Sequence, residues 1–277
     1  GIRDSSVTGV QTCALPILWN WMSENNNTDG SGIFDPRCKV FFETNGGNEW
    51  KPQLQNGANP VQGPGAYRNG AYPNGRDRGQ TLQDWSNKGN SCYYSSVNYY
   101  LGRDDAYIPE IIITVAEVSL LKAEAYNRGI GVSKDAAKAK SAYETGIRSS
   151  INFWYSLVNL CAGTSTWVIN KPVLADSDVD KYLANPKIAY NSNETNALKQ
   201  IYAQIWIDSF RQPWIAFNLY RRTLSTPHDE SGAYDANQNK FYKVPYPESE
   251  KNYNNENYTK ALNGKTNTPE NKLFWHK

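Results

Sequence analysis

The strongest constraint on the fold of this sequence is a pair of apolar helical patterns joined by a connection of only a few residues. The first pattern predicts a helix from about residue 114 to residue 128, because Gly129 follows it and suits a left-handed helix cap. Ser133 is predicted to cap a second, longer helix that reaches about residue 157. Helices joined so closely pack antiparallel, so the sequence predicts a helical hairpin.

Each predicted helix has one apolar face, which we expect to be buried. Small alanines on these faces occur together with tyrosine and tryptophan, a combination that favours the close packing of tetratricopeptide-like helix pairs. The pattern does not repeat elsewhere in the chain, so it does not by itself predict a solenoid. The first face comprises Val115, Val118, Leu121, Ala125 and Tyr126, and the second comprises Ala136, Ala139, Tyr143, Ile147, Ile151 and Trp154.

Further helices are predicted downstream. A short one follows the string DSDVDKYLANP, and a long one runs from about residue 194 to residue 210 with an apolar stripe. Pro213 ends or kinks this helix, because an interior proline loses a backbone hydrogen bond, and a helical segment over 214–222 continues beyond it. The fold class is therefore mostly α. The stripe of the long helix comprises Leu198, Ile201, Ile205 and Phe210.

Long irregular segments flank this helical region of residues 109–223. Residues 18–108 are dense in glycine, asparagine and proline, and residues 224–277 are polar and rich in turn residues. Aromatic residues spaced through 18–108 indicate that this segment folds onto the helices, since low-complexity disorder lacks them. The chain contains 9 Trp and 19 Tyr but only 8 Phe, so most of its aromatic rings carry a polar group. Such rings are suited to surfaces that are partly exposed to solvent.

The first 17 residues are interpreted as foreign to the protein. The string VTGVQTCALPI, residues 7–17, matches one reading frame of a common sequencing adapter, and it has the wrong order of residues for a lipoprotein signal. We therefore exclude residues 1–17 from the fold and expect the true N-terminus to be missing. No run of about 18 apolar residues follows, as a membrane-spanning helix would need.

Composition and motifs provide little support for catalysis, metal binding or nucleic-acid binding. The net charge is only +2, with both signs interspersed. The two histidines, His228 and His276, stand alone, and no HExxH, GxSxG, GxGxxG or P-loop string occurs. Outside the excluded segment, three widely spaced cysteines form neither a disulfide framework nor a zinc pattern. NNNTDG and DSDVD only partly resemble calcium loops, and turn and helix-start roles explain them better. No metal or cofactor is expected.

Several strings resemble, in order, those of the SusD/RagB-type outer-membrane nutrient-binding lipoproteins. PEIIITVAEVSLLKAEAYNRG followed by AAKAKSAYETGIRSSINFW is similar to the family's helical hairpin, and FDPRCKVFFETNGGNEW is similar to its Asp-Pro-Arg strand and loop. IYAQIWIDSFRQPWIAFNLYRRT, KVPYPESEKNYNNENYTKAL and NKLFWHK resemble its later segments. The chain departs from the family pattern at Val115, where an aromatic residue is usual, and at Phe274, where a tryptophan is usual.

The resemblance implies a tetratricopeptide-like helical-hairpin scaffold with long irregular loops. Residues 18–277 would be the C-terminal part of a single SusD-like domain in a longer protein, whose lipid anchor and first helical repeats lie outside this sequence. Such a protein sits on the external face of the outer membrane over a SusC-like TonB-dependent transporter. It captures oligosaccharide, or in some members peptide, and does not break bonds.

The leading functional hypothesis is therefore glycan capture without catalysis. Sugars present an apolar ring face and many hydroxyls, so a receptor needs aromatic platforms beside polar side chains. A peptide-binding lid of the RagB type and an intracellular tetratricopeptide-like scaffold remain as alternatives, and an enzyme is the weakest. Aromatic residues that only pin a loop to the helices would give the same pattern. The candidate ligand-binding residues are Trp50, Tyr67, Trp85, Asn87, Asn90, Tyr93 and Tyr94.

Overall fold

The computed structural model describes residues 17–25, 27–42, 44–45, 49–51, 95, 109–162, 172–223, 225–227 and 242–272, without the side chains of 161 and 162. Helices make up the regular secondary structure of these residues, and an isolated β-bridge pairs Ser23 with Ile33. The contacts divide the chain into two units, Gly1–Pro227 and His228–Lys277. A mostly α fold, as the sequence predicts, is confirmed.

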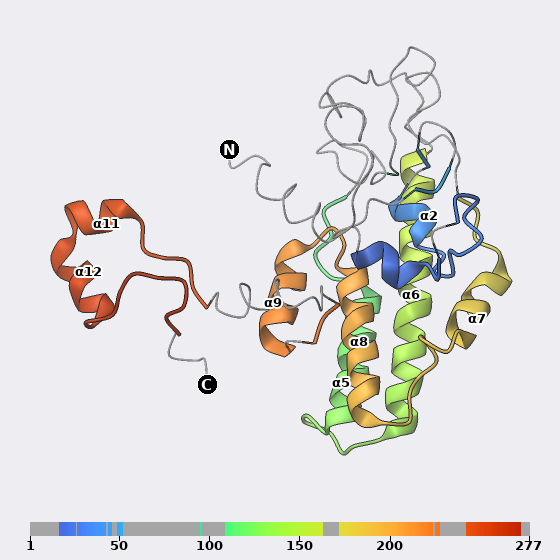
Figure 1. Cartoon of the computed structure of the whole chain (residues 1–277). Coiled ribbons are helices and arrows are strands. Elements are labelled where there is room, and N and C mark those ends of the chain that lie inside the picture. The colour runs from blue at the N-terminus through green and yellow to red at the C-terminus, as the bar shows by residue number, and fades with distance from the viewer. Residues whose placement is uncertain are drawn as a thin grey trace, which may run out of the picture. The chain divides into compact units, whose positions relative to one another are not determined.

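Two antiparallel helices, α5 (Val115–Arg128) and α6 (Ala136–Ala162), form the centre of the first unit (Figure 1). The Thr114 hydroxyl caps α5 by accepting a hydrogen bond from the Glu117 N–H at 2.9 Å, and Gly129 ends it in the left-handed conformation with φ 71°. The predicted hairpin is thus confirmed, but the start of α6 is not at Ser133. The Asp135 carboxylate caps it instead, by accepting from the Lys138 N–H at 2.9 Å.

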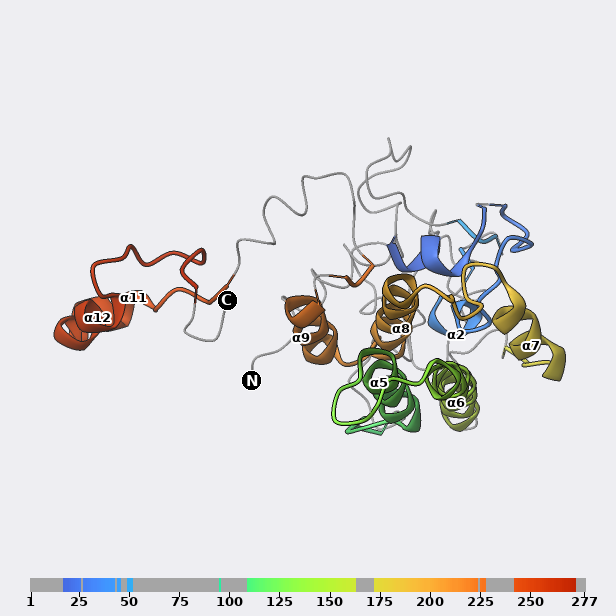
Figure 2. The same ribbon diagram turned by 90° about the horizontal axis from the view of Figure 1, so that it is seen from below.

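The predicted buried face of α6 is confirmed, whereas that of α5 is wrong. On α6 only Ala136 of the predicted set is exposed, while the other five side chains are buried. On α5 the residues Val115, Val118 and Leu121 face outward. A different set of side chains is buried beside α6 and α8, the helices next to α5 in Figure 2. These positions are buried because α5 is enclosed on two sides by close-packed neighbours. The buried set on α5 is Ala116, Ser119, Leu120, Ala123, Glu124 and Asn127.

Gly146 of α6 marks a point of close approach to α5. A Cβ atom placed there would lie 2.6 Å from Leu120 Cγ and 3.4 Å from the Ala116 carbonyl oxygen. The substitution Gly146→Ala gains about 1 kcal/mol of helix propensity but costs about 1–3 kcal/mol through overpacking. We expect a net loss of about 1 kcal/mol in urea unfolding. Ser141→Ala, on the exposed face of the same helix, is the control, and a Gly146→Ala variant more stable than wild type would contradict the packing.

Three more helices follow the hairpin among the described residues of the first unit. They are α7 (Asp176–Ala184), α8 (Glu194–Asp208) and α9 (Pro213–Thr223). The long predicted helix and its break at Pro213 are confirmed, since α8 ends at Asp208 and Pro213 is the first residue of α9. In its last turns α8 buries Ile201 and Ile205, which belong to its predicted stripe.

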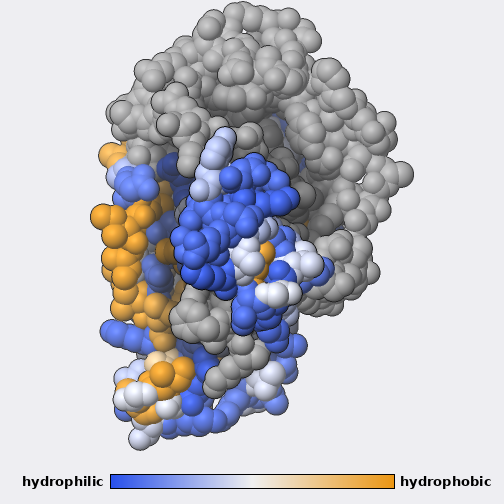
Figure 3. Space-filling model, turned by 90° about the vertical axis from the view of Figure 1, so that its left-hand side faces the viewer, coloured by the Kyte–Doolittle hydropathy of each residue, from blue (hydrophilic) through white to orange (hydrophobic). Residues whose placement is uncertain are grey.

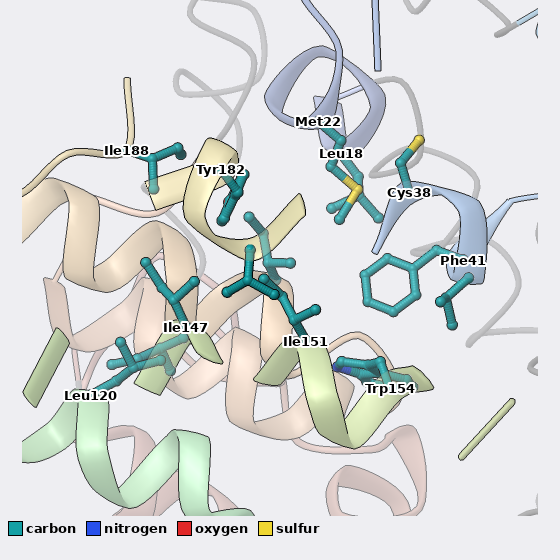
Figure 4. Packing of buried hydrophobic residues seen from close by; sticks show 14 of the residues in the cluster. Leu18, Met22, Cys38, Phe41, Leu120, Ile147, Ile151, Trp154, Tyr182 and Ile188 are labelled. Atoms are coloured by element: carbon teal, nitrogen blue, oxygen red, sulfur yellow. The ribbon is translucent and has the colours of Figure 1, made fainter. Parts of the chain in front are cut away.

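The N-terminal segment covers one end of α6. A short helix over 17–22 and α2 (Cys38–Phe41) contribute Leu18, Met22 and Phe41 to the core, where they meet Ile151 and Trp154 of α6 (Figure 4). The carbonyl of Met22 accepts hydrogen bonds from two backbone N–H groups, those of residues 34 and 35, at 3.1 and 3.2 Å. The family resemblance suggested a strand around Asp-Pro-Arg, and the helical turn of α2 corrects that expectation.

The second unit contains two short helices, α11 (Glu248–Tyr253) and α12 (Asn255–Leu262), which the sequence analysis placed in a loop-rich tail. None of its described residues, 242–272, is buried. The sequence pattern did not predict these two helices, because neither has an apolar stripe long enough to detect. Among the described residues of the whole chain, no helix has the length and apolar character needed to cross a bilayer.

Candidate functional site

A fully buried arginine fixes the segment that leads to the candidate site. The Arg37 guanidinium donates to both carboxylate oxygens of Asp35, at 2.7 and 3.0 Å, and neither side chain is exposed. It also donates to the hydroxyls of Ser150 on α6 and Tyr182 on α7, at 2.9 and 3.0 Å, and to Gln204 Oε1 on α8 at 2.7 Å. One side chain therefore joins the N-terminal segment to three helices.

The network extends from Arg37 to a second buried carboxylate. Ser150 Oγ donates to one oxygen of Asp208 at 2.7 Å, and Thr114 Oγ1 donates to the other at 2.7 Å. Burial alone would lower the pKa of the Arg37 guanidinium, but the charges of Asp35 and Asp208 outweigh it and raise this pKa. The arginine therefore stays charged, and the two carboxylates have a permanent counter-charge.

Glu117 adds a pH-dependent cost next to this network. Burial and then the charge of Asp208 raise the pKa of Glu117, and a hydrogen bond from the Thr114 N–H opposes them. An ionised Glu117 therefore costs stability above its folded pKa, and the cost is relieved as the pH falls through that pKa. We expect Glu117→Gln to raise the melting temperature at about pH 7 and to lose this advantage at about pH 4. Equal melting temperatures at neutral pH would contradict this electrostatic account.

Trp50 is the one candidate residue that the structure describes. Its ring is partly buried, with its centroid 5.9 Å from that of Trp19 and the two planes tilted by 38°. The backbone N–H of Trp50 donates to the Thr28 carbonyl at 2.7 Å. Gly30, with φ 79°, passes so close that a Cβ there would lie 2.6 Å from Trp50 Cδ1. Trp50 is thus held in one orientation, with part of its ring exposed.

The residues on either side of Trp50 in the sequence are polar and pair with one another. The backbones of Asn45 and Glu49 pair through an N–H to carbonyl hydrogen bond of 2.8 Å, and Asn45 Oδ1 accepts from the Glu49 N–H at 2.9 Å. Glu49 forms an ion pair with Lys51 at 3.2 Å. Hydrogen bonding from Lys51 and from Asn45 lowers the pKa of Glu49, which is therefore a carboxylate at neutral pH. The segment that carries Trp50 therefore also holds charged and amide groups in a fixed arrangement.

The structure also pairs Lys51, the residue after Trp50, with Ser95. The Ser95 N–H donates to the Lys51 carbonyl at 2.8 Å, and the Lys51 N–H donates to Ser95 Oγ at 2.9 Å. Ser95 directly follows Tyr94 in the sequence, so the residue after Trp50 pairs with the residue after the predicted Tyr93–Tyr94 platform. The remaining candidates lie outside the described residues. They are Tyr67, Trp85, Asn87, Asn90, Tyr93 and Tyr94.

Sequence reasoning missed the roles of Gly30 and Asn45. The pair Asp29–Gly30 is typical of a turn, and this pattern could have predicted the left-handed conformation of Gly30. In that turn Asn25 and Asp29 accept backbone N–H groups, at 2.9 and 2.8 Å, so their oxygens serve the loop. No sequence pattern predicted the role of Asn45, because its hydrogen bond with Glu49 depends on how the loop between them folds.

The other patterns considered for metal binding or nucleophilic chemistry have structural explanations where they are described. Asp176 and Asp178 begin α7, and Asp178 accepts the Ala175 N–H at 3.1 Å. Asp180 pairs with Arg148 at 2.6 Å. Cys38 is buried, which raises the pKa of its thiol. Within the described ranges, no three His, Cys, Asp or Glu side chains gather as a metal site would require.

A known protein family and several solved structures are similar to this chain. Residues 32–247 match the model of the SusD-like family, described as starch-binding and associating with the outer membrane. A solved SusD-like protein from Bacteroidetes AC2a aligns with 74% of this chain at 24% identity and a TM-score of 0.46. A solved chitin-binding protein aligns with 66% at 24% identity and a TM-score of 0.48. The chain spans 36% of each of these structures, and no curated protein matches it significantly.

Proposed function

This chain belongs to the SusD-like family, and we propose that it binds an oligosaccharide at the outer-membrane surface without cleaving it. The bound sugar is then passed to a SusC-like TonB-dependent transporter, over which the full-length protein is held by a lipid anchor. The family's starch-binding description and its association with the outer membrane support this proposal. No cofactor or metal is part of it.

The observation that carries the proposal is the pairing of Lys51 with Ser95 beside the fixed ring of Trp50. A sugar needs an aromatic surface for its apolar ring face and polar groups for its hydroxyls. Trp50 supplies a partly buried aromatic ring, and Glu49, one residue earlier in the sequence, supplies an ionised carboxylate. The sequence adds further aromatic and amide residues just before Ser95. Together these features favour sugar recognition over recognition of an extended peptide backbone.

The proposal predicts a measurable loss of glycan affinity for each aromatic residue that stacks on the sugar. Replacement of Trp85, Tyr93 or Tyr94 by alanine is expected to remove about 1 kcal/mol of binding, or about fivefold in Kd. For Trp50, Trp50→Phe is the better variant, because it keeps a ring on Trp19 while shortening the exposed edge. Isothermal titration calorimetry with maltooligosaccharides and chitooligosaccharides measures these changes.

Trp214→Ala is the matched control for these variants. Trp214 is 76% exposed at the start of α9, so its loss removes a surface tryptophan without touching the Trp50 region. We expect this variant to bind glycan as wild type does. Full affinity in all of the Trp85, Tyr93 and Tyr94 variants, with wild-type protein that does bind, would show that the ligand sits elsewhere.

A further inference from the structure

The pair Asn263–Gly264 ends α12 in a backbone conformation that few residues adopt. Both residues have positive φ, 47° and 77°, and Asn263 is the one residue other than glycine with positive φ in the described part of the chain. Both are exposed to solvent. The described surface of the second unit is mostly hydrophilic, drawn blue in Figure 3.

The two groups of this pair that can react with each other have no other partner. Neither the side-chain amide of Asn263 nor the backbone N–H of Gly264 forms a hydrogen bond with any described residue. A Cβ atom placed on Gly264 would meet nothing within 4 Å, so the backbone there is uncrowded. Because glycine has no side chain, its N–H can approach the side-chain carbonyl of the residue before it.

Little free energy keeps this end of α12 closed. The helix is 8 residues long, shorter than helices that persist alone in water, and no described residue of the second unit is buried. The Asn263 N–H donates to the carbonyls of Thr259 and Lys260, at 3.1 and 3.2 Å, which are bonds of a helix end that frays. Local opening therefore lets Asn263 leave the left-handed conformation and sample others.

We propose that Asn263 is a site of spontaneous deamidation. The backbone nitrogen of Gly264 attacks the side-chain carbonyl carbon of Asn263, and the new C–N bond closes a five-membered succinimide ring. The side-chain amide leaves as ammonia and takes with it the proton of the attacking nitrogen. Water then opens the ring at one of its two carbonyls and gives aspartate or isoaspartate. The reaction consumes one water, releases one ammonia, and involves no oxidation or reduction.

A second Asn-Gly pair, Asn45–Gly46, is the matched comparison within the same chain. Asn45 is only 4% exposed, and Glu49 binds both ends of its amide. The Asn45 oxygen Oδ1 accepts from the Glu49 N–H at 2.9 Å, and Nδ2 donates to Glu49 Oε2 at 3.3 Å. These bonds must break before the Asn45 amide can react. We therefore expect deamidation at Asn45 to be slower than at Asn263 by about tenfold or more.

Deamidation weakens the end of α12. The new carboxylate places a negative charge at a helix C-terminus, where the helix dipole disfavours it. Isoaspartate in addition inserts a carbon atom into the backbone, so the left-handed turn that directs the Asn263 N–H to Thr259 and Lys260 is lost. The modified chain is thus expected to open at α12 more often than the fresh chain does.

The first test follows the wild-type chain during storage at physiological temperature and slightly alkaline pH. Cleavage after glutamate places the two sites on separate peptides, Thr44–Glu49 and Asn257–Glu270, and fragment ions in mass spectrometry assign each conversion to its asparagine. We expect Asn263 to convert about tenfold faster than Asn45 or more. Equal rates, or a faster reaction at Asn45, would overturn the proposal.

The same time course in guanidinium chloride separates structure from local sequence. Once the chain is unfolded, both pairs are free Asn-Gly sequences, so we expect their rates to agree within about twofold. A large rate difference that persists in the unfolded chain would overturn the structural argument, because neighbouring residues alone would then set the rates.

The variant Asn263→Gly tests the effect on α12. Glycine suits the left-handed cap and has no amide to lose, so this variant keeps the helix and cannot deamidate at this position. Hydrogen exchange of α12 is expected to become about twofold to fivefold faster in the stored wild-type chain, from the helix-dipole effect, and to stay unchanged in the stored variant. Unchanged exchange in a wild-type chain whose Asn263 has converted would contradict the expected weakening.

Discussion

Replacing Arg37 with methionine is expected to lower the free energy of unfolding by about 3–5 kcal/mol, the cost of breaking a buried ion pair. Methionine has a similar length and fills the space, so the loss comes from charge and hydrogen bonding. The substitution leaves the fully buried carboxylate of Asp35 without its counter-charge, and it removes one hydrogen-bond donor each from Gln204 Oε1 and the Tyr182 hydroxyl. Chemical denaturation followed by circular dichroism measures the difference.

Arg148→Met is the control for this prediction. Arg148 also pairs with an aspartate, Asp180, at 2.6 Å, but both side chains are about half or more exposed, at 49% and 69%. Exposed pairs contribute about 0–1 kcal/mol, so this variant should be nearly neutral. If Arg37→Met were no worse than Arg148→Met, then the buried network would not hold the N-terminal segment to the helices.

The second large effect is expected from Trp154→Ala, with a loss of about 3–5 kcal/mol. The Trp154 ring is fully buried and meets Phe41 edge-on, with centroids 4.8 Å apart. Phe41 in turn stacks on Phe210 at 4.3 Å. A cavity here removes the contact that joins α2 to α6 and the end of α8, and thermal and denaturant unfolding would both report it.

Two controls separate packing from other causes. Trp154→Phe should cost clearly less than Trp154→Ala, because it keeps a ring and removes an indole N–H that is buried with no hydrogen-bond partner among the described residues. Trp214→Ala should change stability by less than about 0.5 kcal/mol, since Trp214 is on the surface. Similar losses at Trp154 and Trp214 would contradict the assignment of Trp154 to the core.

The sequence predicted the helices better than the faces they bury. On α6, the large side chains from Tyr143 to Trp154 identify the buried side, because only one side of that helix is available to them. On α5, Val115, Val118 and Leu121 point outward, whereas Ala116, Leu120 and Ala123 face the interior. The apolar pattern does not distinguish these two sides, because both carry aliphatic residues and only the neighbouring helices decide which side is covered.

The buried ion pair of Arg37 and Asp35 could not be predicted from the sequence, for a different reason. Arginine and aspartate are seldom fully buried, so the string FDPR gave no indication that Arg37 and Asp35 form the centre of a network. Its partners Ser150, Tyr182 and Gln204 lie 113, 145 and 167 residues away. No local pattern encodes partners at such separations. Only the folded arrangement of α6, α7 and α8 brings them together.

The sequence predicts which types of residue the candidate site contains, but it does not predict how they are arranged in space. The sequence identifies Trp50 only as an aromatic residue in a loop. In the structure, contacts with Gly30 and Trp19 determine the orientation of its ring. The pairing of Lys51 with Ser95 joins two segments separated in the sequence by 44 residues. This is a contact that turn residues and aromatic spacing cannot specify. The stacking roles of Trp85, Tyr93 and Tyr94 stay predictions.

The most direct test of the central claim is a titration of the wild-type protein with a panel of oligosaccharides, followed by mass spectrometry of the recovered sugar. Our account predicts saturable binding of at least one glycan class and recovery of that glycan with its mass unchanged after prolonged incubation. Shortened sugar products, or saturable binding of peptides with none of any glycan, would contradict it.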